Sequence, residues 1–155
     1  MARFFTSGRI AIILALTLGL AAGLGAFTFV YARGYSYLSN DPSACANCHI
    51  MREHFDAWHK SSHRNVATCN DCHTPHDLVG KYTVKARNGF WHSFYFTSGN
   101  YPDPLRITSG NKGVTADACR YCHAPIVEAI DHPNAKDAER ADCVRCHRYV
   151  GHLVR

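Results

Sequence analysis

Hydrophobic residues are concentrated in one long run, from Ile10 to Tyr31, that contains no charged residue. As a helix, these 22 residues would extend about 33 Å, enough to cross a bilayer core of about 30 Å. The run exceeds the apolar segment of a cleaved signal peptide, roughly 7–15 residues, although the small residues near its end would also suit cleavage. We predict a retained, single transmembrane helix over residues 10–31.

The flanking segments predict how this helix is oriented. Residues 1–9 are short and basic, with Arg3 and Arg9, and basic segments favour the cytoplasmic side of a membrane. Aromatic residues cluster at both ends of the run, as in interfacial belts. We therefore expect a cytoplasmic N-terminus over residues 1–9 and a domain over residues 32–155 on the other side.

Four copies of the motif CxxCH organise the remainder of the chain. The motif attaches c-type haem, because its two thiols bond to the porphyrin and the adjacent histidine binds the iron. Disulfides or a zinc ribbon would not require a histidine after every second cysteine. We predict four c-type haems, which use all the cysteines of the chain: Cys45, Cys48, Cys69, Cys72, Cys119, Cys122, Cys143 and Cys146.

Motif spacing indicates an internal repeat. The first cysteines of motifs one and two are 24 residues apart, and so are those of motifs three and four. We predict two similar dihaem units joined by an insertion at 74–118, with the chain folding back between the motifs of a unit. So short a chain cannot build a conventional core around four haems. The predicted fold is a small, mostly α-helical multihaem cytochrome c with the porphyrins as its core.

The insertion contains a segment, 88–96, in which five of the nine residues are aromatic. It either covers a haem or lies at the lipid interface beside a site for a lipid-soluble molecule. The formal charge of +5 would suit nucleic acid. Haem propionates would offset most of it, so the basic residues are better explained as partners of propionates and lipid phosphates. We expect membrane lipid, and no nucleic acid, as a partner.

The iron ligands come first from the histidines of the motifs, His49, His73, His123 and His147. The second ligand of each iron decides whether that haem is a closed electron carrier or an open site. It must come from a partner, from Met51 or from the other seven histidines: His54, His59, His63, His76, His92, His132 and His152. By sequence position, His63 and His152 are the best placed to reach other haems.

Four features occur together in this chain: an N-terminal anchor, the motif CxxCHxM at 45–51, the segment CNDCHTPH at 69–76 and a histidine soon after the last motif. This combination resembles the NapC/NirT family of tetrahaem quinol dehydrogenases, and within it the small subunit of cytochrome c nitrite reductase. The resemblance implies that Met51 replaces His49 as a ligand of haem one. It also implies that His63 completes haem four, that His152 completes haem three, and that haem two is open or completed by a partner.

A menaquinol site against the first haem, at the membrane surface, is also implied by the resemblance. Lys85 falls where the family has a lysine in this site, and His92 stands where the family often has an acidic residue. The imidazole of His92 could accept a quinol proton or could bind the first iron. Which of His49, Met51 and His92 binds that iron is left open by the sequence.

The implied function is menaquinol oxidation by a hetero-oligomer in which this chain passes electrons to a periplasmic multihaem nitrite reductase. The alternative is a donor to a different periplasmic reductase. The sequence has no CxxCK motif and no Arg, His and Tyr set recognisable by spacing, so we do not expect the chain itself to reduce nitrite. Because c-type haem is attached outside the bacterial inner membrane, residues 32–155 are expected in the periplasm.

Overall fold

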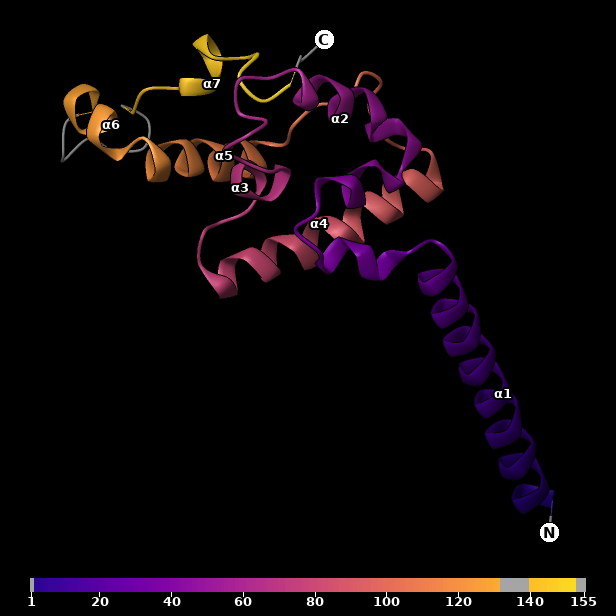
Figure 1. Ribbon diagram of the computed structural model, residues 1–155. Helices are drawn as coiled ribbons and strands as arrows, with labels where there is room; N and C mark the ends of the chain where they lie inside the picture. The colour runs from indigo at the N-terminus through magenta and orange to yellow at the C-terminus, as the bar shows by residue number, and fades with distance from the viewer. Residues whose placement is uncertain (1, 132–139, 153–155) are drawn as a thin grey trace. The chain divides into compact units, whose positions relative to one another are not determined.

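The computed structural model describes residues 2–131 and 140–152, and for residues 2–6 the backbone alone (Figure 1). Within these residues all regular structure is helical, and no strand occurs. The chain divides into two compact units, Met1–Ser36 and Tyr37–Arg155. The predicted mostly α class is therefore confirmed.

The first unit is dominated by one helix, α1, which spans Ala2–Tyr31. Within Ser7–Tyr31, an 18-residue window reaches a mean hydropathy of 2.4, and none of that window is buried. The length and composition of the helix suffice to cross a membrane. The helix ends just before Arg33, whose φ of 52° is the left-handed conformation common after helix C-termini. The predicted apolar span thus lies in a helix that also includes the basic segment before it.

The second unit consists of short helices and one long one. The 3₁₀ helix η1 (Gly34–Leu38) leads into it, and the others are η2 (Pro42–Asn47), η3 (His49–Met51), α2 (Arg52–His59), α3 (Cys69–His73), α4 (Leu78–Ser98), α5 (Ser109–Cys122), α6 (Ala124–Ile130) and α7 (Cys143–Cys146). Side-chain caps explain several starts. Thr68 and Asp71 form a capping box at α3, and Asp77 accepts a hydrogen bond from the Gly80 amide at α4. After α2 the chain folds back, closed by a hydrogen bond of 3.1 Å from the Trp58 indole to the Ala67 carbonyl.

The four motifs pack in the order in which the chain presents them. The contacting pairs are η2 with α3, α3 with α5, and α5 with α7 (Figure 1). The most extensive contact is that of α3 with α5, which joins motif two to motif three across the boundary of the sequence repeat. Both predicted dihaem repeats therefore lie within one compact unit.

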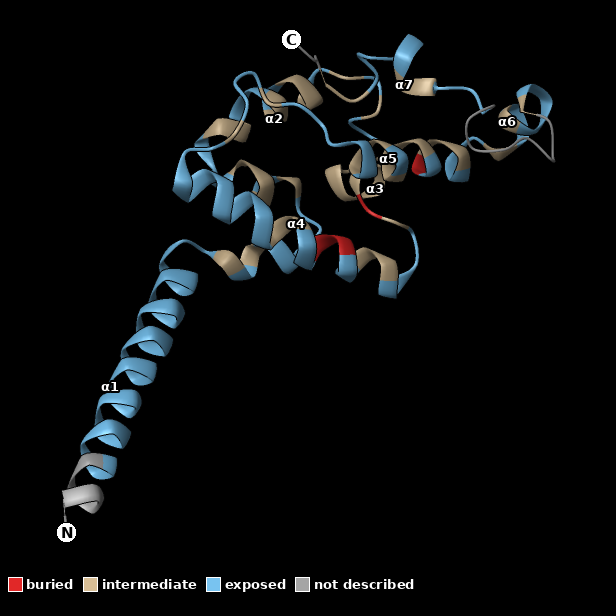
Figure 2. Ribbon diagram, turned by 180° about the vertical axis from the view of Figure 1, so that it is seen from behind, coloured by how far each residue is buried: buried red, intermediate tan, exposed pale blue. Residues whose placement is uncertain are grey.

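A conventional hydrophobic core is nearly missing from the described residues (Figure 2). The buried hydrophobic residues are Val84 and Ala118, and the buried polar ones are Thr74 and Lys85. Large apolar side chains such as Tyr121 and Ile126 remain exposed, whereas they are normally enclosed in a folded domain. This is the arrangement expected of a chain folded around large apolar groups, and it fits the predicted porphyrin core.

Candidate functional site

The attachment cysteines of successive motifs lie beside each other. The thiols of Cys45 on η2 and Cys69 on α3 are hydrogen-bonded, which lowers the pKa of Cys45 in the polypeptide. Burial, followed by the charge of the nearby Cys119, raises the pKa of Cys72 to about 11. Cys119 is in turn close enough to Cys143 to be influenced by its charge. Groups attached to these thiols would form a continuous series.

Two of the motif histidines face a second imidazole. The ring centroids of His123 and His63 are 6.1 Å apart, and those of His73 and His152 are 6.0 Å apart. A metal–imidazole bond is about 2 Å long, and the bound nitrogen lies about 1 Å from the centre of its ring. Two imidazoles that share one iron would therefore have centroids about 6 Å apart. Burial lowers the pKa of His73 to about 4, so its ring is neutral and a nitrogen is free to bind metal. The residues present fit bis-histidine haem at motifs two and three.

These pairs differ from those implied by the family resemblance. His63 was expected at haem four and lies opposite the motif-three histidine; His152 was expected at haem three and lies opposite the motif-two histidine. Among the described residues, His147 of motif four has no ring opposite it. The expected ligands of haems two, three and four therefore stay predictions.

The other spare histidines occupy different surroundings. His54 stacks on His152 at 5.0 Å, and His59 lies edge-on to Phe55 at 4.5 Å. His76 stacks on Tyr121 at 4.1 Å, at the contact between motifs two and three. His132 lies outside the described residues. No group of three or more His, Cys, Asp or Glu within the described part is arranged to hold a metal ion, although the His152 ring is stacked on those of both His54 and His73.

Motif one has different surroundings. It is formed by the 3₁₀ helices η2 and η3, with Met51 as the last residue of η3. The ring facing His49 is that of Phe96, at 5.7 Å. Burial, followed by the charges of the nearby Cys45 and Cys48, raises the pKa of Tyr37 to about 12. Tyr37 is therefore a neighbour of motif one. Whether His49, Met51 or His92 binds the first iron therefore stays open.

Lys85 is buried on α4, with its ammonium group on the segment that precedes motif one. Its Nζ donates to the Ser39 carbonyl at 2.6 Å and lies 3.4 Å from the Leu38 carbonyl oxygen. Burial, followed by the charge of Lys81, lowers the pKa of Lys85. The Asn70 amide, next to the second motif's first cysteine, also donates to the Ser39 carbonyl, at 3.2 Å. Lys85 and Asn70 therefore hold the same peptide group in place.

His92 is two helical turns beyond Lys85 on the same face of α4. Its Nδ1 is 3.3 Å from the Tyr37 hydroxyl. Solvent reaches the ring, yet desolvation by the surrounding protein lowers the pKa of His92, so the imidazole is neutral at pH 7. Through Tyr37, the predicted quinol-site residue His92 is connected to motif one.

One face of α4 thus runs along the segment 37–49. The residues on this face recur at helical spacing. Lys85 contacts Leu38 and Ser39. Gly89 and His92 contact Tyr37, and Phe96 contacts His49. The Tyr37 ring approaches Gly89 so closely that an added Cβ would be 3.4 Å from it. The sequence named Lys85 and His92 as expected quinol-site residues but gave Tyr37 no role there, because its contact with His92 joins residues 55 positions apart.

Comparisons with known proteins identify the family of the chain. Residues 6–155 match the model of the NapC/NirT cytochrome c family, N-terminal region. The chain is 36% identical to the cytochrome c-type protein NrfH of Wolinella succinogenes, over 85% of this chain and 81% of that protein. It is 34% identical to the cytochrome c nitrite reductase subunit NrfH of Nitratidesulfovibrio vulgaris, over 87% and 80%. A crystal structure of the cytochrome c nitrite reductase NrfHA complex bound to the HQNO inhibitor contains a similar chain, with a TM-score of 0.62, 29% identity and coverage of 89% and 90%.

Proposed function

Because the chain belongs to the NapC/NirT cytochrome c family, we propose that it oxidises menaquinol at the membrane and passes electrons to a nitrite reductase catalytic subunit. Relatives named NrfH and the solved NrfHA complex support the partner. The observation that carries the proposal is the contrast among the motifs. Motifs two and three offer paired imidazoles, whereas motif one offers His49 and Met51 beside Lys85, Tyr37 and His92.

Four c-type haems would be held by the four motifs. Each haem, when bound, supplies an iron that takes up and releases one electron. His73 with His152, and His123 with His63, are the histidine pairs that we infer would hold the irons of motifs two and three. His49 or Met51 would bind the iron of motif one. Four paired cysteine sites within one compact unit support this count.

The residues around motif one would bind and deprotonate the quinol. Lys85 fixes the 38–39 segment through its carbonyls and leaves a cationic group beside the site. His92 would donate its Nδ1 hydrogen to the Tyr37 oxygen, which leaves Nε2 without a proton and free to accept one from the quinol. The lowered pKa of His92 supports a neutral acceptor at physiological pH.

At the other end of the series, the iron of motif four would be completed by a residue of the catalytic subunit. His147 is exposed and stands at the C-terminus of α7. The ion pair between Lys112 and Asp142, at 2.6 Å, holds the start of this motif to α5. A partner that reaches His147 would close the last iron and form the hetero-oligomer.

We place α1 across the bacterial inner membrane, with residues 1–9 in the cytoplasm and residues 32–155 in the periplasm. The length and composition of α1 support the anchor. Attachment of c-type haem on the periplasmic side supports the orientation. On this proposal the motif nearest the anchor in sequence receives electrons from the membrane.

The experiment is reconstitution of the full-length cytochrome in liposomes with a water-soluble menaquinol analogue. Quinol oxidation coupled to nitrite consumption should require the nitrite reductase subunit and should be inhibited by HQNO. Nitrite turnover by the isolated chain would contradict the donor function. Coupling to another periplasmic reductase, but not to nitrite reductase, would favour the alternative donor function.

A further inference from the structure

The second half of α4 has two faces of different character. At about 3.6 residues per turn, Gly89, His92 and Phe96 share the face that contacts Tyr37 and His49. Phe90, Trp91, Phe94 and Tyr95 lie on the opposite side of the helix. We call these four residues the aromatic face of α4.

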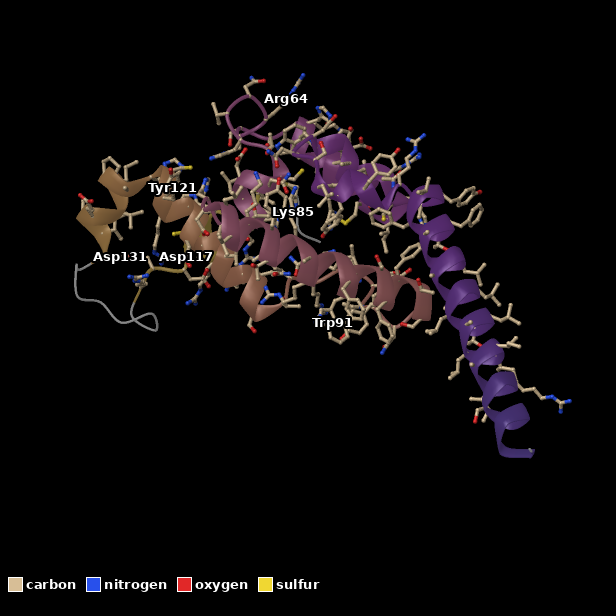
Figure 3. All side chains as sticks on the ribbon, turned by 90° about the horizontal axis from the view of Figure 1, so that it is seen from below. Arg64, Lys85, Trp91, Asp117, Tyr121 and Asp131 are labelled. Carbon is tan, nitrogen blue, oxygen red and sulfur yellow. The ribbon has the colours of Figure 1, made fainter. Side chains whose placement is uncertain are left out.

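The aromatic face is exposed and continuous. Its four side chains are between 39% and 64% exposed, and their rings contact one another at centroid distances from 5.2 to 6.4 Å. In Figure 3, Trp91 lies at the outer edge of α4, whereas Lys85 lies among side chains of neighbouring elements. Exposed apolar surface of this kind marks a contact site. The face of α4 that contacts motif one is the opposite face, which carries Gly89, His92 and Phe96. A haem-covering role for the aromatic face is therefore not favoured.

Two observations identify the occupant as lipid. First, no residue from 88 to 102 carries a formal charge, and Trp and Tyr beside Phe are the side chains that favour the membrane–water interface. Second, the short segment between α1 and Tyr37 limits the distance between the end of α1 and Tyr37. Tyr37, which bonds to His92, follows the last residue of α1 by six positions, and so many residues reach at most about 21 Å when extended.

We propose that the aromatic face of α4 inserts into the headgroup region of the same bilayer that α1 crosses. It would be a second, interfacial membrane contact of the kind made by amphipathic surface helices. One helix alone would leave the haem-motif unit free to tilt on a short tether. A second contact through the aromatic face, on the side of α4 opposite His92, would hold the unit in one orientation.

Photolabelling tests this directly, and it requires neither quinol nor a partner. The full-length cytochrome in nanodiscs of phosphatidylcholine and phosphatidylglycerol would be irradiated with diazirine-bearing phosphatidylcholine and digested with trypsin. Cleavage after Arg87 and Arg106 releases residues 88–106, which contain the aromatic face and no haem cysteine. We expect label in 88–106 and in the α1 peptide 10–33, and none in the α2 peptide 53–60.

Matched variants make the test specific. F90S/F94S should lose the label in 88–106, while I126S/I130S, which changes two exposed residues at the same spacing on α6, should retain it. Covalent haem content and the absorption spectrum report whether each variant is intact. An unlabelled 88–106 peptide beside a labelled 10–33 peptide would overturn the proposal. If F90S/F94S instead loses co-purification of the nitrite reductase subunit while 88–106 is unlabelled in the wild type, the aromatic face binds the partner and the proposal is wrong.

Discussion

Motif one and motifs two and three are built from the same five-residue pattern but have different surroundings. His73 and His123 each face an imidazole at about 6 Å, 6.0 and 6.1 Å in the two cases, whereas His49 faces the ring of Phe96 at 5.7 Å. Motif one is also built on 3₁₀ rather than α-helical turns. The difference is made by residues distant in sequence, since His63, His152 and Phe96 all lie outside the motif that they face.

The comparison shows how one attachment motif supports two tasks. A site closed by two imidazoles relays electrons and excludes other ligands. A site bordered by a buried lysine, a tyrosine and a neutral histidine has groups that can bind a polar headgroup and accept its protons. The attachment chemistry is shared, and the surroundings decide the task.

The largest effect is expected when a facing imidazole is removed. His63→Ala and His152→Ala should each abolish one low-spin bis-histidine signal in electron paramagnetic resonance, because the opposite histidine then binds an iron with an open position. His76→Ala, whose ring stacks on Tyr121, is the control and should leave all signals unchanged. Low-spin signals that survive in both variants, with haem content intact, would break the contrast between the motifs.

A smaller but still direct effect concerns the first iron. Met51→Leu keeps the volume of the side chain and removes the sulfur. If Met51 binds the iron of motif one, the spectrum of one haem should change and quinol oxidation should slow. An unchanged spectrum would exclude Met51 and leave His49 or His92 as the ligand, which would make motif one more similar to the others.

Lys85→Met should lower the free energy of unfolding of the holoprotein by about 1–3 kcal/mol, because the Ser39 carbonyl loses its charged donor. Denaturant unfolding, followed by haem absorbance, measures this. Lys60→Met on the exposed end of α2 is the control and should change stability by less than about 0.5 kcal/mol. Equal stability of the two variants would show that Lys85 does not hold the 38–39 segment.

The pH dependence of quinol oxidation tests His92. The lowered pKa of His92 keeps the imidazole neutral down to and below its ordinary value of about 6.5, so activity should persist to that pH and decline only at more acidic values. His92→Asp should retain activity and move the acidic decline further down, since the ordinary pKa of aspartate is about 3.9. A decline at the same pH in both proteins would exclude His92 as the proton acceptor.

The smallest effect is expected for Tyr37→Phe, which keeps the ring beside Gly89 and removes the hydroxyl that meets His92. A hydrogen bond of about 0.5–1.5 kcal/mol corresponds to a reduction in kcat of roughly two- to tenfold. The change should appear in kcat and in the acidic decline of the pH–activity profile, with little effect on the KM for quinol. A change in KM alone would indicate that Tyr37 only shapes the binding site.

Local patterns made the helical class and the apolar α1 predictable. The apolar run shows α1 directly, and Asp41 before Pro42 indicates the start of η2, where its carboxylate accepts a hydrogen bond from the Ser43 amide at 2.9 Å. The ring pairs His63–His123 and His73–His152 were not predictable, because they depend on which helices pack together. The contact of α3 with α5 is set by the tertiary fold, and no spacing rule connects His63 to His123 or His152 to His73. Tyr37 was missed for the same reason, since its partner is 55 residues away.

The nearly missing hydrophobic core also has a consequence for biogenesis. With Val84 and Ala118 as the buried hydrophobic residues of the described part, the polypeptide alone has too little apolar burial to offset the conformational entropy lost on folding. Covalent attachment then becomes the step that commits the chain to its native state, as for domains whose folding is coupled to a bound group. A chain that has missed one attachment would remain open to proteolysis, so incomplete cytochromes would be degraded before they could reach a partner.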